Sequence, residues 1–255
     1  MSVAEFSLKG KVAIVTGGSR GIGRSIAIGL AEHGADVAIA ARKPDALAEA
    51  LAAVSATGRR AIAVPTNVRH IDELRRLVDE TERQLGRVDI LVNNAGTNPV
   101  YGPVQEIDER AWDSIMNTNV KSAHFLSNFA REAMLRHGEG GSMIHVSSVG
   151  GFLASDVIGG YSVSKAALVM LTQVQAKTWG QDRIRVNCIA PGLIKTEFSR
   201  ALWENPKFLE ASVRDAALHR IAEADEMAGA AVFFASAASS FVTGQTLILD
   251  GGRRL

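Results

Sequence analysis

Short runs of β-branched and other apolar residues alternate along this chain with longer segments whose apolar residues recur at helical spacing. The run Lys11–Thr16 is typical of a buried strand, and within Gly21–His33 the residues Ile22, Ile26 and Leu30 form one helical stripe. Because parallel strands need a crossover connection, which is usually a helix, this alternation predicts a parallel sheet with helices on both faces. Right-handed crossovers make it a doubly wound α/β sheet of about seven strands, which binds ligands beyond the carboxyl ends of its strands.

The rest of the chain continues this pattern with one interruption. We expect further strands at Asp36–Ala41, Ala61–Pro65, Asp89–Asn93, Ser142–Ser147, Arg183–Ala190 and Gln245–Leu249. We expect further helices at Pro44–Thr57, Ile71–Leu85, Arg110–His137, Tyr161–Gly180 and Asp225–Ser236. The segment of about residues 191–220 departs from the alternation and is interpreted as an inserted helical flap. Because no linker or internal repeat interrupts the sequence, residues 1–255 are expected to form a single domain.

Charge and cysteine content argue against several classes of protein. Lys and Arg total 28 and Asp and Glu total 27, a balance that argues against a nucleic-acid partner. No apolar run approaches the ~18–20 residues of a membrane span, and the N-terminal segment lacks an apolar signal core, so we expect a cytoplasmic protein without a membrane partner. The single cysteine, Cys188, excludes an internal disulfide. The six histidines, among them His70, His137 and His219, are interpreted as solvated, and no metal site is expected.

A glycine-rich turn follows the first predicted strand directly. Its sequence, TGGSRGIG over Thr16–Gly23, places Gly17, Gly21 and Gly23 at the spacing G-x-x-x-G-x-G. Glycines in such a turn let the chain bend tightly and let a pyrophosphate approach the N-terminus of the following helix. The turn therefore predicts a dinucleotide site, and a tight strand-to-helix turn without a ligand is the alternative.

Three further motifs follow this turn in order. Asn93-Asn94-Ala95-Gly96 ends the fourth predicted strand, Tyr161-Ser162-Val163-Ser164-Lys165 opens a helix, and Pro191-Gly192 follows the sixth strand. Together with the glycine turn, they resemble the single-domain members of the short-chain dehydrogenase/reductase family. The resemblance extends over essentially the whole chain and implies a Rossmann-type fold, a nicotinamide cofactor and oxidoreductase activity. The stretch from Arg185 to Trp203 is also similar to NADPH-dependent carbonyl and retinal reductases of this family.

The residues after the second predicted strand indicate which nicotinamide cofactor is used. Ala41 stands where NAD-using members of the family usually carry an aspartate, and Arg42 follows it. An acidic residue there would repel the 2′-phosphate of NADP, whereas a guanidinium group can bind that phosphate. Arg20 in the glycine turn belongs to the same region in NADP-using relatives. We therefore expect NADP(H) to be preferred, with NAD(H) possible; two solvated arginines are the alternative.

Tyr161 and Lys165 are the expected catalytic pair. They lie four residues apart on a predicted helix and therefore share one face. A nearby ammonium stabilises a phenolate and lowers its pKa from about 10, which would suit Tyr161 to proton transfer. Ser148 matches the family's catalytic serine and is expected to hydrogen-bond the substrate carbonyl oxygen. Ser147 is the competing residue, because adjacent strand residues point to opposite faces and only one of the two can serve.

Asn119 completes the expected catalytic set. In the family an asparagine seven residues after a helix tryptophan supports the active-site lysine through a water, and Trp112 to Asn119 keeps this interval. Asn117 is the alternative, on a different face of the helix. The resemblance also implies which residues bind the cofactor. Among them, Asn67 and Val68 are expected to contact the adenine. The full set is Gly17, Ser19, Arg20, Gly21, Ile22, Gly23, Arg42, Asn67, Val68, Asn93, Ala95, Gly96, Tyr161, Lys165, Pro191, Gly192, Ile194 and Thr196.

Substrate contacts are expected from the flap, from the loop between Gly150 and Gly160, and from the rim after the fourth strand. The residues concerned are Asn98, Phe152, Leu153, Phe198 and Leu202. The apolar loop favours a small-molecule carbonyl or alcohol with a hydrophobic body, and packing of the loop against a neighbouring subunit is the alternative. The usual assembly of the family implies a homotetramer.

Two other functions stay open at this point. The 3-oxoacyl-[acyl-carrier-protein] reductases share the expected catalytic residues and receive an acidic carrier protein on basic residues of two helices; Arg131 and Lys177 stand at similar places. A non-catalytic, cofactor-sensing protein on the same fold is the remote alternative. Such proteins typically lose the Tyr/Lys pair that is present here.

Overall fold

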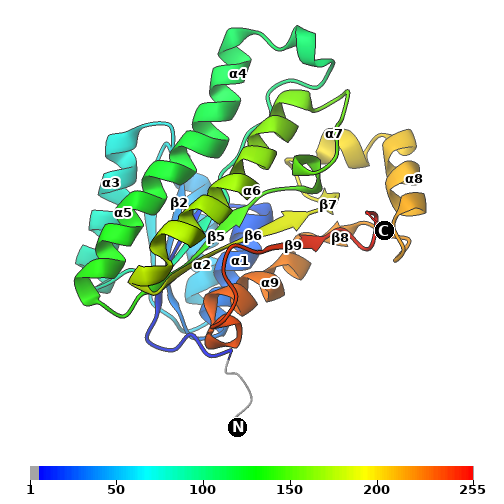
Figure 1. Ribbon diagram of the computed structural model, residues 1–255. Coiled ribbons are helices and arrows are strands. Elements are labelled where there is room, and N and C mark those ends of the chain that lie inside the picture. Colours follow the sequence, from blue (N-terminus) through cyan, green and yellow to red (C-terminus); the bar gives the residue numbers. More distant parts are fainter. Residues whose placement is uncertain (1–5, 255) are drawn as a thin grey trace.

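A single parallel sheet lies at the centre of the fold (Figure 1). The computed structural model describes residues 6–254. The seven strands of the central sheet lie in the order β3-β2-β1-β4-β5-β6-β9, and every pairing between them is parallel. They are β1 (Val12–Thr16), β2 (Asp36–Ala41), β3 (Ala61–Pro65), β4 (Ile90–Asn93), β5 (Gly141–Val146), β6 (Ile184–Pro191) and β9 (Thr246–Leu249). The predicted doubly wound, Rossmann-type fold is confirmed.

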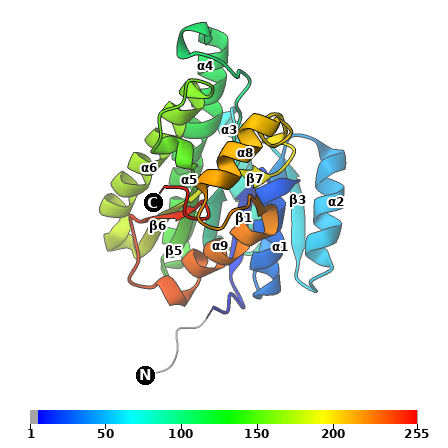
Figure 2. The same cartoon turned by 90° about the vertical axis from the view of Figure 1, so that its right-hand side faces the viewer.

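Helices cover both faces of this sheet (Figure 2). One face carries α1 (Gly21–Glu32), α2 (Pro44–Ser55) and α9 (Ala228–Ala235). The other carries α3 (Ile71–Leu85), α5 (Ser122–His137) and α6 (Gly159–Trp179), and α4 (Glu109–Met116) extends beyond the sheet.

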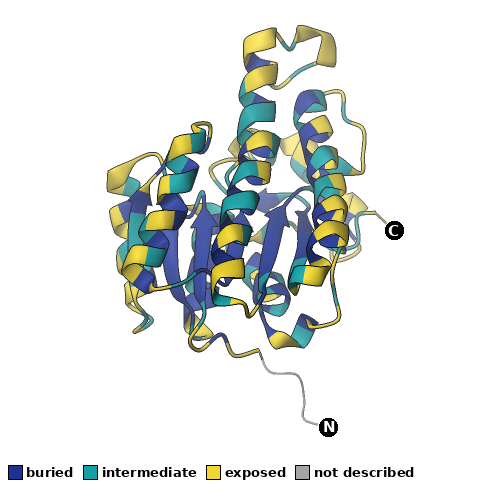
Figure 3. Ribbon diagram, turned by 60° about the vertical axis from the view of Figure 1, so that its left-hand side comes forward, coloured by how far each residue is buried: buried dark blue, intermediate teal, exposed yellow. Residues whose placement is uncertain are grey.

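Burial on both faces explains why the strands read as continuous apolar runs. In β1, Ala13 and Val15 pack under α1 and α9, whereas Val12 and Ile14 pack under α3 and α5. All four side chains are at most 2% exposed. A strand with two buried faces has no polar side to alternate with the apolar one. Figure 3 shows the result: the inner strands are buried, and most of the exposed residues lie on the outer surfaces of the helices and in the loops. The edge strands β3 and β9 are only partly buried.

The order of strands reverses at β1, which has β2 on one side and β4 on the other. The chain first builds the sheet outwards through β2 and β3 and then returns to add β4 on the opposite side. Loops leaving β1 and β4 therefore diverge at the carboxyl edge, where an open α/β sheet binds its ligands.

The single helix expected over Arg110–His137 is interrupted in the structure. It consists of α4 and α5 joined by a π-helical turn over Asn117–Lys121. A π turn inserts an extra residue into a helix. Buried residues at helical spacing continue across this turn, from Ile115 through Asn119 to Ala123, so periodicity did not reveal it. Such turns occur frequently at functional sites.

The segment after β6 is helical, as expected, but two short strands enclose it. The flap contains α7 (Arg200–Trp203) and α8 (Pro206–Asp215), and β7 (Ile194–Lys195) pairs with β8 (Ala222–Glu223) at its base. No residue of α7 is buried, and Ser212 is the only buried residue of α8. Among the helices that the structure describes, none combines the length and apolar character needed to cross a membrane.

Candidate active site

The expected site residues meet at the carboxyl edge of the sheet. The glycine turn follows β1, Asn93 ends β4, Ser148 follows β5 and Pro191 ends β6. Helix α6 and the π turn lie against this edge from one side, and the flap begins at the other. Segments far apart in sequence thus converge on one place.

The glycine turn is shaped by contacts that exclude side chains. Gly17 and Gly21 have φ angles of 64° and 53°, which glycine adopts without steric cost. A Cβ at Gly23 would collide with the carbonyl oxygen of Gly17 and with the side-chain nitrogen of Asn94. Asn94 donates from Nδ2 to the carbonyl oxygens of Thr16 and Gly17, at 2.9 and 3.2 Å. Asn94 was not among the expected site residues, and its function is to fix the turn to the end of β4.

Two of the expected cofactor-binding residues are exposed arginines. Arg20 immediately precedes α1, and Arg42 follows β2. Among the carboxylates of residues 6–254, none forms an ion pair with either guanidinium group. Both groups are therefore available for an anion, and Arg20 lies at the N-terminal end of α1.

The expected adenine contact, Asn67, is held in a local turn. Its Oδ1 accepts from the backbone nitrogen of Arg69 at 3.3 Å, and its own backbone nitrogen donates to Glu73 at 2.7 Å. That backbone hydrogen bond is the largest of the influences that lower the pKa of Glu73. Val68 is 8% exposed. The amide oxygen of Asn67 keeps a second lone pair for a ligand.

Tyr161 lies beside Ser148 near the start of α6. Burial raises the pKa of the Tyr161 hydroxyl above its usual value of 10, and the side-chain hydrogen bond with Ser148 opposes that shift. The sequence predicts that Lys165 lowers the pKa of Tyr161. In the structure the effect of burial is larger and raises this pKa instead, so the Tyr161 phenol is protonated at neutral pH.

Lys165 is 3% exposed, and its ammonium lies beneath the site. Its Nζ donates to the carbonyl oxygen of Val146 at 2.7 Å and lies 5.3 Å from the centroid of the Tyr161 ring. Burial lowers the pKa of Lys165 to about 8. An ammonium has three donors, so Lys165 can still bind a hydroxyl group or water.

Ser148 and Ser147 face different environments. Ser147 is buried and donates from Oγ to the backbone oxygen of Lys165 at 2.8 Å, which fastens β5 to α6. Ser148 is part-exposed, accepts from the backbone nitrogen of Gly150 at 3.1 Å and is hydrogen-bonded to Tyr161. Of the two serines, Ser148 is therefore the one next to Tyr161.

Asn119 lies in the middle of the π turn, and three hydrogen bonds fix its side chain. Its Oδ1 accepts from Thr97 N at 2.8 Å, and its Nδ2 donates to Thr97 O at 3.1 Å and to Ser164 Oγ at 2.9 Å. A Cβ built on Gly96 would lie 3.6 Å from both Asn119 Oδ1 and Lys165 Nζ. Asn119 thus ties the loop after β4 to α6 next to the lysine. Asn117 has no comparable side-chain bond among the described residues.

The start of the flap closes the site from the β6 side. A Cβ on Gly21 would lie 3.4 Å from Thr196 Cγ2, so the glycine turn and the flap are in close proximity. Trp203 donates from Nε1 to the carbonyl oxygen of Thr196 at 2.8 Å, and Ser199 hydrogen-bonds the carbonyl oxygen of Ile194. These bonds give the expected cofactor segment after Pro191 a defined conformation.

The expected substrate residues lie on different walls. The centroid of the Phe198 ring lies 5.9 Å from that of the Tyr161 ring, and the two rings are tilted by 42°. Phe152 and Leu153 are 37% and 42% exposed, and the guanidinium of Arg254 lies 4.7 Å from the Phe152 ring. Leu202 belongs to α7, and Asn98 is hydrogen-bonded to the side chain of Tyr101. Tyr101 was not predicted as a site residue.

Comparison with known proteins identifies the family. Residues 17–254 match the family described as Enoyl-(Acyl carrier protein) reductase. The rabbit (Oryctolagus cuniculus) protein named Dehydrogenase/reductase SDR family member 4 is 39% identical over 245 residues, 96% of this chain and 94% of the relative. Gluconate 5-dehydrogenase of Gluconobacter oxydans is 37% identical over 247 residues, 97% and 96% of the two chains. The chain belongs to the short-chain dehydrogenase/reductase family.

Solved structures of this family superpose on almost the whole chain. A gluconate 5-dehydrogenase from Burkholderia cenocepacia, in complex with NADP and tartrate, has a TM-score of 0.93 at 35% identity and covers 99% of this chain and 98% of its own. A 7α-hydroxysteroid dehydrogenase complexed with NADH and 7-oxo glycochenodeoxycholic acid has a TM-score of 0.94 at 32% identity, with 99% and 97% covered. Members of the family are oxidoreductases that bind nicotinamide cofactors, and this chain is one of these oxidoreductases.

The site has the features that such a cofactor requires. Gly17, Gly21 and Gly23 add no side chains of their own to the turn at the start of α1, and Arg20 and Arg42, which form no ion pair with a described carboxylate, add positive charge. Lys165 retains donors for ribose hydroxyl groups. The residues present therefore fit a nicotinamide dinucleotide.

One histidine contradicts the prediction that these residues are solvated. His145, in the middle of β5, is 0% exposed. Its Nε2 lies 2.8 Å from Gln175 Oε1, and its Nδ1 lies 3.3 Å from Asn93 Nδ2. Because Asn93 donates to Nδ1, the ring proton is on Nε2 and donates to Gln175. The position of His145 within a strand predicted to be buried was the signal that sequence reasoning missed.

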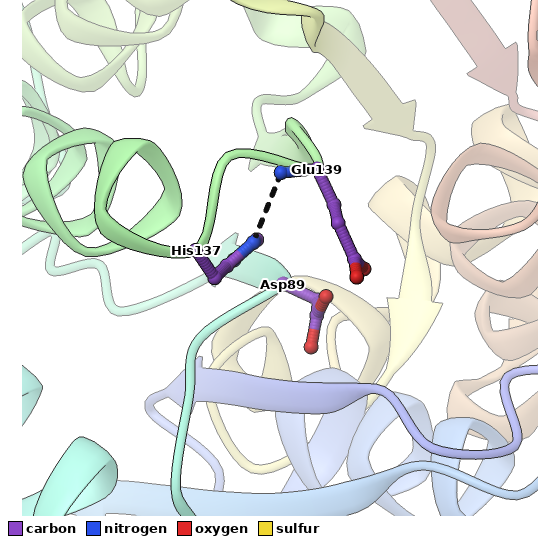
Figure 4. A group of neighbouring side chains, drawn as sticks. All are labelled: Asp89, His137 and Glu139. Atoms are coloured by element: carbon purple, nitrogen blue, oxygen red, sulfur yellow. Dashed lines mark hydrogen bonds between the residues drawn. The ribbon is translucent and has the colours of Figure 1, made fainter.

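At the opposite edge of the sheet, Asp89, His137 and Glu139 bring ligand-type atoms within 4.8 Å of one another (Figure 4). Arg87 forms ion pairs with both carboxylates at 2.6 Å, and Lys11 pairs with them at 3.2 and 3.3 Å. His137 accepts at Nδ1 from the backbone of Glu139 and bonds the carbonyl oxygen of Val88 through Nε2. Because cations and backbone groups already use these atoms, the cluster is an ion-pair network and not a metal centre.

Proposed function

We propose that this chain is an NADP(H)-dependent oxidoreductase that reduces a ketone or aldehyde to an alcohol, with Tyr161 as the general acid/base. The observation that carries the proposal is the placement of a protonated Tyr161 phenol beside Ser148 and above the buried Lys165 ammonium. A carbonyl oxygen bound between the two hydroxyl groups would receive both hydrogen bonds. This arrangement stabilises the negative charge that develops on the oxygen during reduction.

Each residue then has one task in the reaction. Ser148 donates a hydrogen bond to the substrate oxygen and fixes its position. Tyr161 transfers its phenolic proton to that oxygen as it becomes an alkoxide, and the adjacent Lys165 ammonium stabilises the resulting phenolate. Asn119 holds the loop after β4 against α6, so that the lysine keeps its place. The nicotinamide ring, when bound, supplies the hydride.

Three groups of residues would hold the cofactor. Gly17, Ser19, Gly21, Ile22 and Gly23 would present the turn and the α1 N-terminus to the pyrophosphate. Arg20 and Arg42 would bind the 2′-phosphate of NADP, because each guanidinium is exposed and neither is neutralised by an ion pair with a described carboxylate. The adenine, ribose and nicotinamide would lie against Asn67, Val68, Asn93, Ala95, Gly96, Lys165, Pro191, Gly192, Ile194 and Thr196.

A carbonyl compound with an apolar body fits the walls of the site. Phe198, Phe152 and Leu153 present partly exposed apolar side chains near Tyr161 or on the adjoining loop. Asn98 and Leu202 would complete the contacts. A polyhydroxylated substrate, such as the name of the Gluconobacter relative suggests for that enzyme, would find few hydrogen-bond partners on these walls.

The carrier-protein alternative is less well supported. Arg131 pairs with Asp182 at 2.6 Å and lies 5.9 Å from the Trp179 ring, so its charge is already used within the chain. Lys177 alone would have to receive the acidic partner. We therefore propose a free small molecule as the substrate, and further propose a cytoplasmic homotetramer without nucleic-acid or membrane partners.

Turnover of a panel of ketones, aldehydes and acetoacetyl thioesters with NADPH and with NADH tests the proposal. Ketones with apolar groups and NADPH are expected to give the highest kcat/KM. Tyr161→Phe is expected to remove most turnover and to keep cofactor binding. Faster turnover of the thioesters would support the carrier-protein reductase, and wild-type turnover by Tyr161→Phe would refute the catalytic role.

A further inference from the structure

Both tyrosines of the chain lie at the candidate site, although only Tyr161 has a part in the proposed reaction. Tyr101 belongs to the loop after β4 and is 41% exposed. Its hydroxyl donates to the backbone oxygen of Phe198, in the flap, at 3.3 Å. The charge of an ionised Tyr101 would also raise the pKa of Tyr161, so the two phenols are within electrostatic reach of each other.

Phe198 contacts both Tyr101 and the proposed catalytic residue Tyr161. Its ring lies 5.9 Å from the Tyr161 ring, tilted by 42°, while 44% of the residue stays exposed. The backbone oxygen that holds Tyr101 and the ring that covers Tyr161 belong to the same residue. Motion of the flap at Phe198 would therefore break the hydrogen bond and uncover the catalytic tyrosine together.

The loop that carries Tyr101 forms one side of the mouth of the site, and contacts with the loop around Val157 and Ile158 fix its position. Gly102 donates from its backbone nitrogen to the carbonyl oxygen of Val157 at 2.8 Å and forms an isolated parallel bridge with Ile158. A Cβ on Gly159 would lie 3.2 Å from Val104, so the two loops are closely packed. Tyr101 thus projects from a rim that two loops stabilise jointly.

The flap itself is weakly packed. Its helices α7 and α8 contribute one buried residue between them, Ser212. Behind it, a pocket of about 180 Å³ lies between α8, the β7–β8 base and the end of β9, with Ile194, Ala216 and Leu249 among its lining residues. Segments with few buried contacts open at low free-energy cost, so a single hydrogen bond can shift the balance between open and closed flap.

We propose that Tyr101 and Phe198 form a latch across the mouth of the site. The Tyr101 hydroxyl holds the flap closed at Phe198, and the Phe198 ring selects substrates that carry a flat apolar group, such as a phenyl ring, next to the carbonyl. This inference rests on the proposed carbonyl reduction. A flat group can pack against the Phe198 ring in an offset or edge-on arrangement, whereas a methyl group loses most of that contact.

Two diones with the same reactive centre test the selection. 1-Phenyl-1,2-propanedione and 2,3-butanedione differ by a phenyl against a methyl group, and we expect the wild type to prefer the phenyl compound by about tenfold or more in kcat/KM. Phe198→Ala is expected to bring the two values within about twofold, while the conservative Phe198→Tyr keeps the preference. Phe241→Ala, at a fully exposed ring in the loop before β9, is the matched control with unchanged preference.

The latch is tested by Tyr101→Phe, which removes only the hydroxyl. The hydroxyl is also hydrogen-bonded to Asn98 in its own loop, but only the bond to Phe198 crosses to the flap. Loss of this one neutral hydrogen bond across the mouth predicts a rise in KM of about three- to tenfold for both diones, with kcat changed by less than about twofold. Backbone amide exchange in residues 196–215 should accelerate by a similar factor in Tyr101→Phe and stay unchanged in Phe241→Ala.

Three results would overturn parts of this inference separately. Unchanged exchange and KM in Tyr101→Phe would exclude the latch. An equal loss for both diones in Phe198→Ala would exclude the selection. Turnover of neither dione by the wild type, with either cofactor, would contradict the proposed function and the selection with it, while the exchange measurement would still decide the latch.

Discussion

The Nζ atom of Lys165 lies 5.3 Å from the ring centroid of Tyr161, one turn earlier on α6, with a single backbone oxygen as its hydrogen-bond partner among the described groups. Burial lowers the pKa of Lys165 to about 8 and raises that of Tyr161. The protein therefore keeps a buried ammonium under a protonated phenol. This is a costly arrangement for stability, and it is useful only if a reaction places negative charge on the phenol.

Lys165→Met is expected to stabilise the cofactor-free protein and to remove activity. At pH 7 the substitution removes a buried charge, and the expected gain in free energy of unfolding is about 1–3 kcal/mol.

The pH dependence of stability gives a second test of Lys165. The free lysine titrates near 10.5 and the folded one near 8. The unfolded chain thus binds more protons between these values, so wild-type stability should rise with pH across this window relative to the variant. Thermal unfolding at pH 7 and 10, with Lys9→Met as the exposed control, measures both effects; a lower stability of Lys165→Met at pH 7 would contradict the argument.

Arg42→Ala is expected to weaken NADPH binding by about 10- to 100-fold, the usual effect of losing one charge-assisted hydrogen bond to a phosphate. NADH binding should change by less than about twofold, because the free ribose hydroxyl group does not need the cation. Fluorescence titration with both cofactors gives the two constants. Lys177→Ala, an exposed cation on α6, should leave both unchanged, and an equal loss for NADH would show that Arg42 does not read the phosphate.

Gly23→Ala is expected to destabilise the fold by about 2–3 kcal/mol, because its Cβ would collide with Gly17 O and displace Asn94 from the turn. Calorimetric titration should show cofactor affinity reduced at least tenfold. Gly229→Ala is the matched control. Its Cβ meets no atom within 4 Å in the first turn of α9, so a gain of up to about 1 kcal/mol is expected there. Equal stabilities for the two variants would rule out the steric argument.

The parts of the site that rest on local sequence could be predicted. The glycine turn follows a strand that both faces bury, and Tyr161 and Lys165 are one helical turn apart, so a pattern of a few residues determines each. The contact of Tyr101 with Phe198 joins residues 97 positions apart and leaves no periodic signal. The π turn around Asn119 was hidden for a different reason, since the buried residues keep helical spacing across it, from Ile115 through Asn119 to Ala123.

Asn119→Ala is expected to cost about 2–4 kcal/mol of folding free energy, because it breaks three hydrogen bonds and leaves both backbone groups of Thr97 without partners. It should also lower kcat at least tenfold, since the loop next to Lys165 loses its connection to α6. Asn117→Ala, two residues earlier in the same π turn, should stay within about 0.5 kcal/mol of the wild type. Denaturant unfolding and steady-state kinetics check both variants, and similar losses in the two would remove the special role of Asn119.

The prediction that all six histidines are solvated was wrong for His145, which is buried. Because of this burial, we expect His145 to make the stability of the fold depend on pH in the acidic range. Burial lowers its pKa to about 4, against 6.5 for a free histidine. Between these values the unfolded chain binds the extra proton, so the His145 contribution makes stability fall as pH drops from 6.5 to 4 and then level off. The full change is about 3 kcal/mol.

His145→Gln should therefore lose less stability than the wild type between pH 6.5 and 4, since a neutral amide can donate to Gln175 and accept from Asn93 without titrating. His124→Gln, at an exposed position on α5, should keep the wild-type pH dependence. Urea unfolding at half-unit steps over this range measures the slopes. Parallel curves for His145→Gln and the wild type would mean that another buried group, and not His145, takes up the proton.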